Sequence, residues 1–128
     1  MVALTPDPFA GERYLNLETY RRTGAAVATP VWFAQDGARL YVYSLAEAGK
    51  VKRIRNNAAV RIAPCDIRGR LRGGWMAARA VIVDGDEAAR GHRLLDEKYG
   101  WQKRIGNITS RLLKRRHAVI SIEITAQA

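Results

Sequence analysis

Residues 25–57, AAVATPVWFAQDGARLYVYSLAEAGKVKRIRNN, predict two strands joined by a tight turn and followed by a short helix. Within 25–34 the side chains alternate between two faces, and such a period of two is typical of a β-strand. One face carries Ala25, Val27, Thr29, Val31 and Phe33, and the other carries Ala26, Ala28, Pro30, Trp32 and Ala34. Asp36-Gly37 is expected to supply the positive φ angles of a hairpin turn, so that the return strand covers 39–44.

The return strand leads at Ser44 into a loop and then into a helix expected over Gly49–Asn56, whose first turn carries Lys50 and Lys52. Backbone N–H groups at a helix N-terminus, a hydroxyl and a lysine ammonium together can hold a phosphate. The two lysines are equally compatible with a solvated charged face, and the pattern alone does not decide between these readings.

The remaining chain predicts mostly strands joined by short turns. Strands are expected over Tyr14–Tyr20, 60–63, 75–83 and 118–124, the third of them buried on both faces, and helices over 87–99 and 105–115. Pro6 and Pro8 predict a loose arm over 1–10. One domain over 1–128 is expected, mainly β, in the form of an antiparallel barrel with appended helices.

The composition narrows the possible partners. A net charge of +10 attracts anions, and nucleic acid, a membrane surface or a phosphorylated cofactor all qualify. Cys65 is the only cysteine, and His92 and His117 show no ligand spacing, so neither a disulfide nor a metal site is expected. The absence of a long apolar run or a secretion signal predicts a cytoplasmic protein without membrane contact. No Ser/His/Asp or Cys/His set is visible, so no catalytic side chain is assigned.

Several residues keep two readings. Trp32, Tyr41 and Tyr43 are core or interface residues more often than they are cofactor contacts. Pro30 must lie at a strand edge or bulge, where a planar ligand can also approach. Asp66, Arg68 and Arg70 either decorate a turn or line a groove, and Arg79 inside an apolar strand needs a partner. A basic tract is either a nucleic-acid surface or a solvated face, and it comprises Lys98, Trp101, Lys103, Arg104, Arg111, Lys114, Arg115 and Arg116.

The order and spacing of several short segments resemble the pyridoxamine-phosphate-oxidase-like split-barrel superfamily, and most closely its small deazaflavin-dependent reductase branch. The segments are LETYR (17–21), TPVWFA (29–34), DG (36–37), LYV (40–42), GKVKRIRNN (49–57), Val60, APC (63–65), RG (68–69), LL (94–95) and KYG (98–100). The resemblance implies a homodimer of six-stranded split β-barrels that binds FMN or coenzyme F420 in two grooves between the subunits. It places the cofactor phosphate at Tyr43, Ser44, Lys50 and Lys52, and the ring system along Val27, Ala28, Thr29, Pro30 and Val31.

The resemblance further implies an oxidoreductase in which the bound cofactor exchanges hydride with a small organic acceptor. A flavin-binding carrier or storage module without its own reaction is the first alternative, and a basic nucleic-acid-binding barrel is the second. Oxidation of pyridoxamine phosphate itself is not expected, because the chain ends at Ala128, without the C-terminal extension that carries substrate-binding residues in the full-length oxidases.

Overall fold

The computed structural model describes residues 7–112 and 117–127, and within them the side chains of 7–100 and 117–125. The elements follow in the order β1 (Tyr14–Tyr20), β2 (Ala26–Val31), β3 (Phe33–Asp36), β4 (Arg39–Leu45), α1 (Gly49–Asn56), β5 (Ala59–Cys65), β6 (Met76–Val83), α2 (Gly85–Leu112) and β7 (His117–Gln127). All strand pairs in the described chain are antiparallel, so the expected mainly β fold is confirmed.

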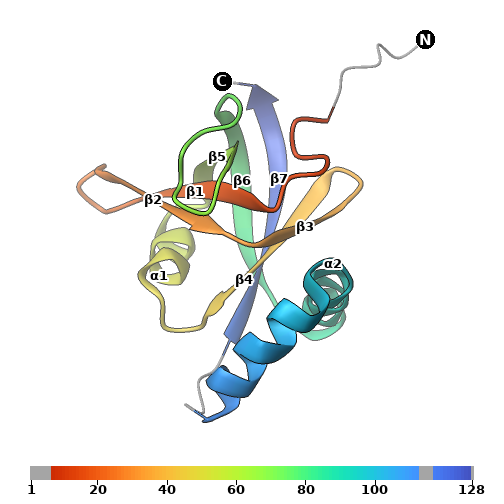
Figure 1. Ribbon diagram of the computed structural model, residues 1–128. Helices are drawn as coiled ribbons and strands as arrows, with labels where there is room; N and C mark the ends of the chain where they lie inside the picture. Colours follow the sequence, from red (N-terminus) through yellow and green to blue (C-terminus); the bar gives the residue numbers. More distant parts are fainter. Residues whose placement is uncertain (1–6, 113–116, 128) are drawn as a thin grey trace.

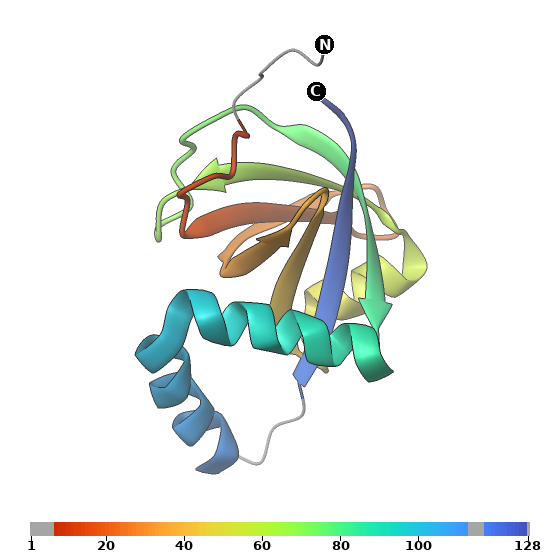
Figure 2. The same cartoon turned by 90° about the vertical axis from the view of Figure 1, so that its right-hand side faces the viewer.

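The strands form one sheet in the order β2-β1-β5-β6-β7-β4-β3. Its two end strands, β2 and β3, are neighbours in the chain and are separated only by Trp32. The sheet must therefore curl round until its ends meet, which makes the split barrel that Figure 1 shows. Helix α1 packs against β1 and β6, whereas α2 runs across the outside of the sheet over β3, β4 and β7 (Figures 1 and 2).

The prediction of a single strand over 25–34 is wrong, because the strand is interrupted at Trp32, which separates β2 from β3. Before the break the chain pairs with β1, and after it the chain pairs with β4 on the other side of the barrel. The alternation of side chains between two faces could not reveal this interruption, because residues on both sides of Trp32 keep the two-residue period of a β-strand. The sheet accordingly has seven strands where six were expected, and β2 with β3 corresponds to one bent strand of the six.

The hairpin turn lies one residue later than expected. Asp36 pairs with Arg39, so the turn consists of Gly37 and Ala38, and Gly37 takes the positive φ of 60°. A left-handed φ is open to glycine without a steric cost, which explains the residue at this position.

The burial of β6 and β1 is the reverse of what was expected. β6 was expected to be buried on two sides, but Arg79 and Val81 are exposed on its outer face, so Arg79 needs no buried partner. In contrast, β1 was expected to be half-buried and is buried on both faces, with Asn16 and Glu18 covered as well as the inward leucines.

The core fills the barrel interior and includes Val51 and Ile54 on the inward face of α1. The loose arm expected over 1–10 is wrong for residues 7–10, because Phe9 is buried and packs edge-on against Phe33. Asp7 holds this turn by accepting a hydrogen bond from the Phe9 N–H at 2.9 Å.

Two helical pieces were expected near the C-terminus, and the structure has one element, α2, with a sharp bend at Gly100. Gly100 has φ 48° and ψ −117°, a conformation that ends a regular helix and lets a second piece start in a new direction. Figure 2 shows the two halves of α2 meeting at this bend. Residues 113–115 of the second expected piece lie outside the described residues.

Candidate cofactor site at the start of α1

The first turn of α1 has the features of an anion site. Ala48 stands at the N-cap and supplies no side-chain hydrogen bond, and no acidic residue lies in the first turn. Within the described residues, no acceptor contacts the N–H groups of Gly49 and Lys50. Unpaired N–H groups and the positive end of the helix dipole favour a negative ligand here.

Lys50 and Arg53 stand next to each other on this helix. Burial of the lysine and, secondly, the charge of Arg53 lower the pKa of Lys50. The Arg53 guanidinium donates to the Thr19 hydroxyl at 2.6 Å and folds back over Gly49, where an added Cβ would lie 2.7 Å from Nη1. No carboxylate in the described chain forms an ion pair with Lys50, so two cations meet here without a negative group between them.

The other predicted phosphate residues do not all gather around Lys50. Lys52 is exposed, and a residue two positions along a helix does not face the first one. Ser44 is buried with its hydroxyl 3.3 Å from the Leu45 carbonyl oxygen, to which it donates. Arg53 is the contact that the sequence reasoning missed, although its i, i+3 spacing from Lys50 was a usable signal.

Tyr43 points away from this site. Its ring stacks on His117 at 4.5 Å between centroids and meets His92 of α2 edge-on at 4.9 Å. Neighbouring residues of a strand point to opposite faces, so Ser44 and the Tyr43 ring do not lie on the same side of β4. The two histidines are 25 positions apart in the chain, so no spacing rule could have brought them together. Among the described residues no group of His, Cys, Asp and Glu is arranged to hold a metal ion.

The predicted ring-binding strand, β2, lies at the end of the sheet. β2 pairs with β1 over Ala26–Val31 and with no other described strand, so its second edge is open. The expectation that Pro30 sits at an edge is confirmed. Along β2 the side chains of Val27, Thr29 and Val31 are half-buried, and those of Ala28 and Pro30 are exposed.

The register tells which backbone groups of β2 point to its open edge. On β5, Pro64 opposes Leu15 and its carbonyl oxygen accepts from Arg72, so Pro64 turns away from β1. Leu15 therefore directs its own groups toward β2, and antiparallel pairs alternate from there. Val31, Thr29 and Val27 are consequently bonded to β1, while the C=O of Pro30 and both groups of Ala28 face outward.

The strand break at Trp32 is held by Tyr99 of α2. The Tyr99 hydroxyl accepts a hydrogen bond from the Phe33 N–H at 3.0 Å and lies 2.7 Å and 2.8 Å from the carbonyl oxygens of Arg13 and Phe33. Burial raises the pKa of Tyr99 to about 12, so the hydroxyl keeps its proton. Trp32 stacks on Tyr99 with 4.6 Å between ring centroids, which supports a structural role for Trp32.

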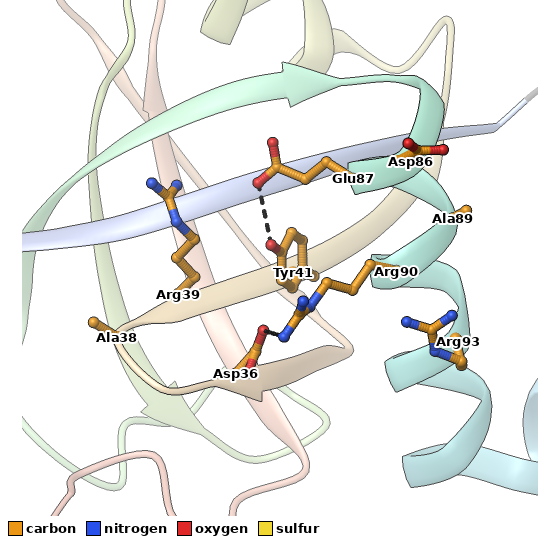
Figure 3. Close-up of a pocket in the computed structure, with 9 residues that line it drawn as sticks. All are labelled: Asp36, Ala38, Arg39, Tyr41, Asp86, Glu87, Ala89, Arg90 and Arg93. Atoms are coloured by element: carbon orange, nitrogen blue, oxygen red, sulfur yellow. Dashed lines mark hydrogen bonds and ion pairs between the residues drawn. The ribbon is translucent and has the colours of Figure 1, made fainter.

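Figure 3 shows a separate cavity of about 810 Å³ between the β3–β4 hairpin and the first turns of α2. Tyr41 donates to Glu87 across it at 3.1 Å, and Arg90 forms an ion pair with Asp36. Because opposite charges already neutralise one another here, this cavity shows no preference for an anion. None of the predicted cofactor residues lines it.

The turn formed by Asp66, Arg68 and Arg70 has a structural explanation. The Asp66 carboxylate accepts from the backbone N–H groups of Arg68 and Arg70 and forms an ion pair with the Arg70 side chain at 2.8 Å. Hydrogen bonds, first that from the Arg70 backbone, lower the pKa of Asp66. Of the basic tract, only Lys98 lies among the described side chains, and residues 101–116 lie outside them.

No helix in the described part of the chain has the length and apolar character that a bilayer crossing requires. Cys65 is buried, and burial raises the pKa of its thiol to about 11.

Comparison with solved structures shows the same fold in proteins of different description. An F420 reductase is 20% identical with a TM-score of 0.60, over 97% of this chain and 98% of that one. A FAD-binding protein from Mesorhizobium loti is 19% identical with a TM-score of 0.59, over 91% and 82% of the chains. HutZ, a heme storage protein from Vibrio cholerae, is 15% identical with a TM-score of 0.62, over 93% and 84%.

Identities this low establish the shared fold, and the neighbours differ in what they bind. No curated protein sequence matches the chain. A family model does match, and it covers residues 7–127, almost the whole length. The chain therefore belongs to the family described as pyridoxamine 5'-phosphate oxidase.

Proposed function

We propose that this protein is an oxidoreductase that binds FMN or coenzyme F420 and uses it to reduce or oxidise a small organic molecule. The bound cofactor would supply the hydride chemistry, and the chain would supply anchoring, orientation and exclusion of water. The absence of an assigned acid–base pair in the sequence agrees with this division of work.

The observation that carries the proposal is the pair Lys50 and Arg53 at the uncapped start of α1. Two cations and free N–H groups without a carboxylate suit a phosphate, because charge-assisted hydrogen bonds are among the strongest that proteins make. Ser44 lies near the end of β4, just before the loop that leads to the start of α1. Tyr43, whose ring is held by α2, would position Ser44, and Lys52 would add to the positive field from its exposed place.

The open edge of β2 would hold the ring system. Its outward backbone groups alternate between the C=O of Pro30 and the N–H and C=O of Ala28, which matches a heterocycle with alternating acceptors and donors. Val27, Thr29 and Val31 would act indirectly, since their backbone groups bond to β1 and keep the strand in place.

A second copy of the chain would complete the site. The cavity between the β3–β4 hairpin and α2 and three further surface pockets of the described chain are lined by residues other than Lys50, Ala28 and Pro30. A groove that forms only between two subunits would leave this face shallow in one subunit. The net charge of +10 favours coenzyme F420, whose tail carries several carboxylates, over FMN alone. We expect the dimer to act in the cytoplasm.

Anaerobic turnover tests the proposal. The purified protein with reduced F420, or with FMN and NAD(P)H, should oxidise the cofactor in the presence of at least one member of a panel of quinones and enones. Binding of a cofactor without turnover of any acceptor would instead identify a carrier or storage protein. Failure to bind either cofactor, together with tight, salt-sensitive binding of nucleic acid, would replace both readings with a nucleic-acid-binding barrel.

A further inference from the structure

Lys98 lies against aromatic rings and makes no ion pair in the described part of the chain. Its ammonium lies 3.5 Å from the centre of the Phe33 ring and 5.3 Å from that of Tyr99. No ion pair joins Lys98 to a carboxylate among the described side chains. The nearby carboxylate, Glu12, is committed to Arg72 at 2.7 Å.

The surroundings of Lys98 make this charge costly. The side chain is half-buried, and burial followed by the charge of Arg13 lowers the pKa of Lys98 to about 8. The Arg13 guanidinium lies over the Tyr99 ring at 5.6 Å, so two cations flank one aromatic group. Aromatic faces offset part of the desolvation cost of an ammonium, and an anionic partner would offset more.

Lys98 lies near the C-terminal end of β2, where the chain continues as β3. Arg53, next to Lys50, bonds to Thr19, which pairs with Val27 near the start of β2. Lys98 lies over Phe33, which follows the end of β2 by two residues. The phosphate anchor therefore lies near the start of β2, and Lys98 lies near the residue at which the chain, after β2, continues as β3.

We propose that Lys98, which shares the neighbouring ring of Tyr99 with the half-exposed Trp32, binds the carboxylate of a flat aromatic acceptor. The assignment of the ligand as the acceptor rests on the proposed oxidoreductase function, whereas the binding of an aromatic carboxylate needs only the folded chain. Trp32 is suited to this role because its ring is fixed by stacking on Tyr99, the same ring whose centre lies 5.3 Å from the Lys98 ammonium.

The test compares 2-naphthoate with its neutral analogue 2-naphthamide by isothermal titration calorimetry, on the whole protein at pH 7. Naphthoate should bind at least about tenfold more tightly than naphthamide, since a charge-assisted contact contributes that much or more. Lys98→Met should remove this preference and Lys98→Arg should retain it. Arg93→Met, which removes an exposed cation from the same helix, should change nothing.

The pH dependence gives a second readout. Glu12, Arg13 and Tyr99 are the other titratable groups around Lys98, and burial raises the pKa of Tyr99 to about 12, above the range of this experiment. Naphthoate affinity of the unmodified protein should fall as the pH rises past about 8, where Lys98 loses its proton, and affinity of Lys98→Arg should stay level.

Equal binding of naphthoate and naphthamide, no binding of naphthoate, or an unchanged preference in Lys98→Met would each overturn the proposal. The result of this binding test does not depend on whether the proposed oxidoreductase function is correct. Binding of F420 or FMN without naphthoate preference would remove only the Lys98 subsite, whereas naphthoate preference without cofactor binding would remove only the oxidoreductase.

Discussion

At the scale of single residues, the Tyr99 hydroxyl holds together the point where the barrel closes. Tyr99→Phe would remove the acceptor of the buried Phe33 N–H and the one hydroxyl hydrogen that lies between the Arg13 and Phe33 carbonyl oxygens. We expect a loss of about 1–3 kcal/mol in the free energy of unfolding, measured by urea denaturation. Tyr14→Phe is the matched control, since its hydroxyl makes no described hydrogen bond, and a loss as small as in that control would show that the network contributes little.

Glu18 gives the molecule a specific sensitivity to acid. Its carboxylate accepts from the Arg61 guanidinium at 2.6 Å and 3.1 Å and from the Tyr20 hydroxyl at 2.9 Å. The hydrogen bond from Arg61 is the first cause that lowers the pKa of Glu18 below its usual 4.5, against the opposing effect of burial. A lowered pKa in the folded state means that this stabilisation is present above about pH 4.5 and is lost as the pH falls through the folded value.

We therefore expect part of the acid destabilisation below pH 4.5 to disappear in Glu18→Gln, which cannot titrate. The measurement is the free energy of unfolding of both proteins between pH 3 and 7. Parallel curves over this range would mean that Glu18 does not contribute to the acid sensitivity.

At the scale of elements, α2 lies unusually close to the sheet at Gly91. A Cβ at this position would lie 2.7 Å from Val119 Cγ1 and 3.1 Å from Cδ1 of the Tyr41 ring. Gly91→Ala should therefore destabilise the fold by about 1–3 kcal/mol, because overpacking forces the helix outward. Gly74→Ala has no atom within 4 Å of the new Cβ and should leave the melting temperature almost unchanged. Equal melting temperatures for the two variants would show that α2 shifts without cost.

The strands and helices also show which parts of the fold the local sequence pattern can predict. Alternation and turn residues predicted β1, α1 and most other strands, because these follow from neighbours in the chain. The pattern could not locate the break at Trp32, since a change of pairing partner leaves the alternation intact. The pattern also gave the wrong burial for β6. Ala77 and Val81 are apolar and were expected in the core, but they lie on the outer face of the strand, whereas Ala78 and Ala80 are buried on its inner face.

The residues of the candidate site also fall into those that local sequence could predict and those that it could not. Lys50 could be predicted from its place at a helix start, and Pro30 from the missing N–H that confines it to an edge. Lys98 and Arg53 acquire their significance from contacts with Phe33 and Thr19, which come from distant parts of the chain. Tyr43 was assigned to the phosphate site by the family resemblance, and the packing of α2 against it shows that its ring faces the other way.

At the scale of the whole molecule, the proposed groove needs two chains. Sedimentation velocity should give twice the 14.3 kDa mass of the chain at micromolar concentration, with or without cofactor. Dimers with closed two-fold symmetry are the commonest protein assemblies and would produce two equivalent grooves. A protein that stays monomeric even with saturating cofactor would contradict the shared groove.

The central claim is that the start of α1 anchors the phosphate of a redox cofactor, and titration of the apoprotein with FMN and with F420 tests it most directly. Lys50→Ala should weaken binding of the preferred cofactor about tenfold or more, which is the effect expected from the loss of a charge-assisted contact. Arg55→Ala, which removes an exposed cation from the last turn of the same helix, should leave the affinity unchanged. Equal affinities of the unmodified protein and Lys50→Ala for that cofactor would contradict the account.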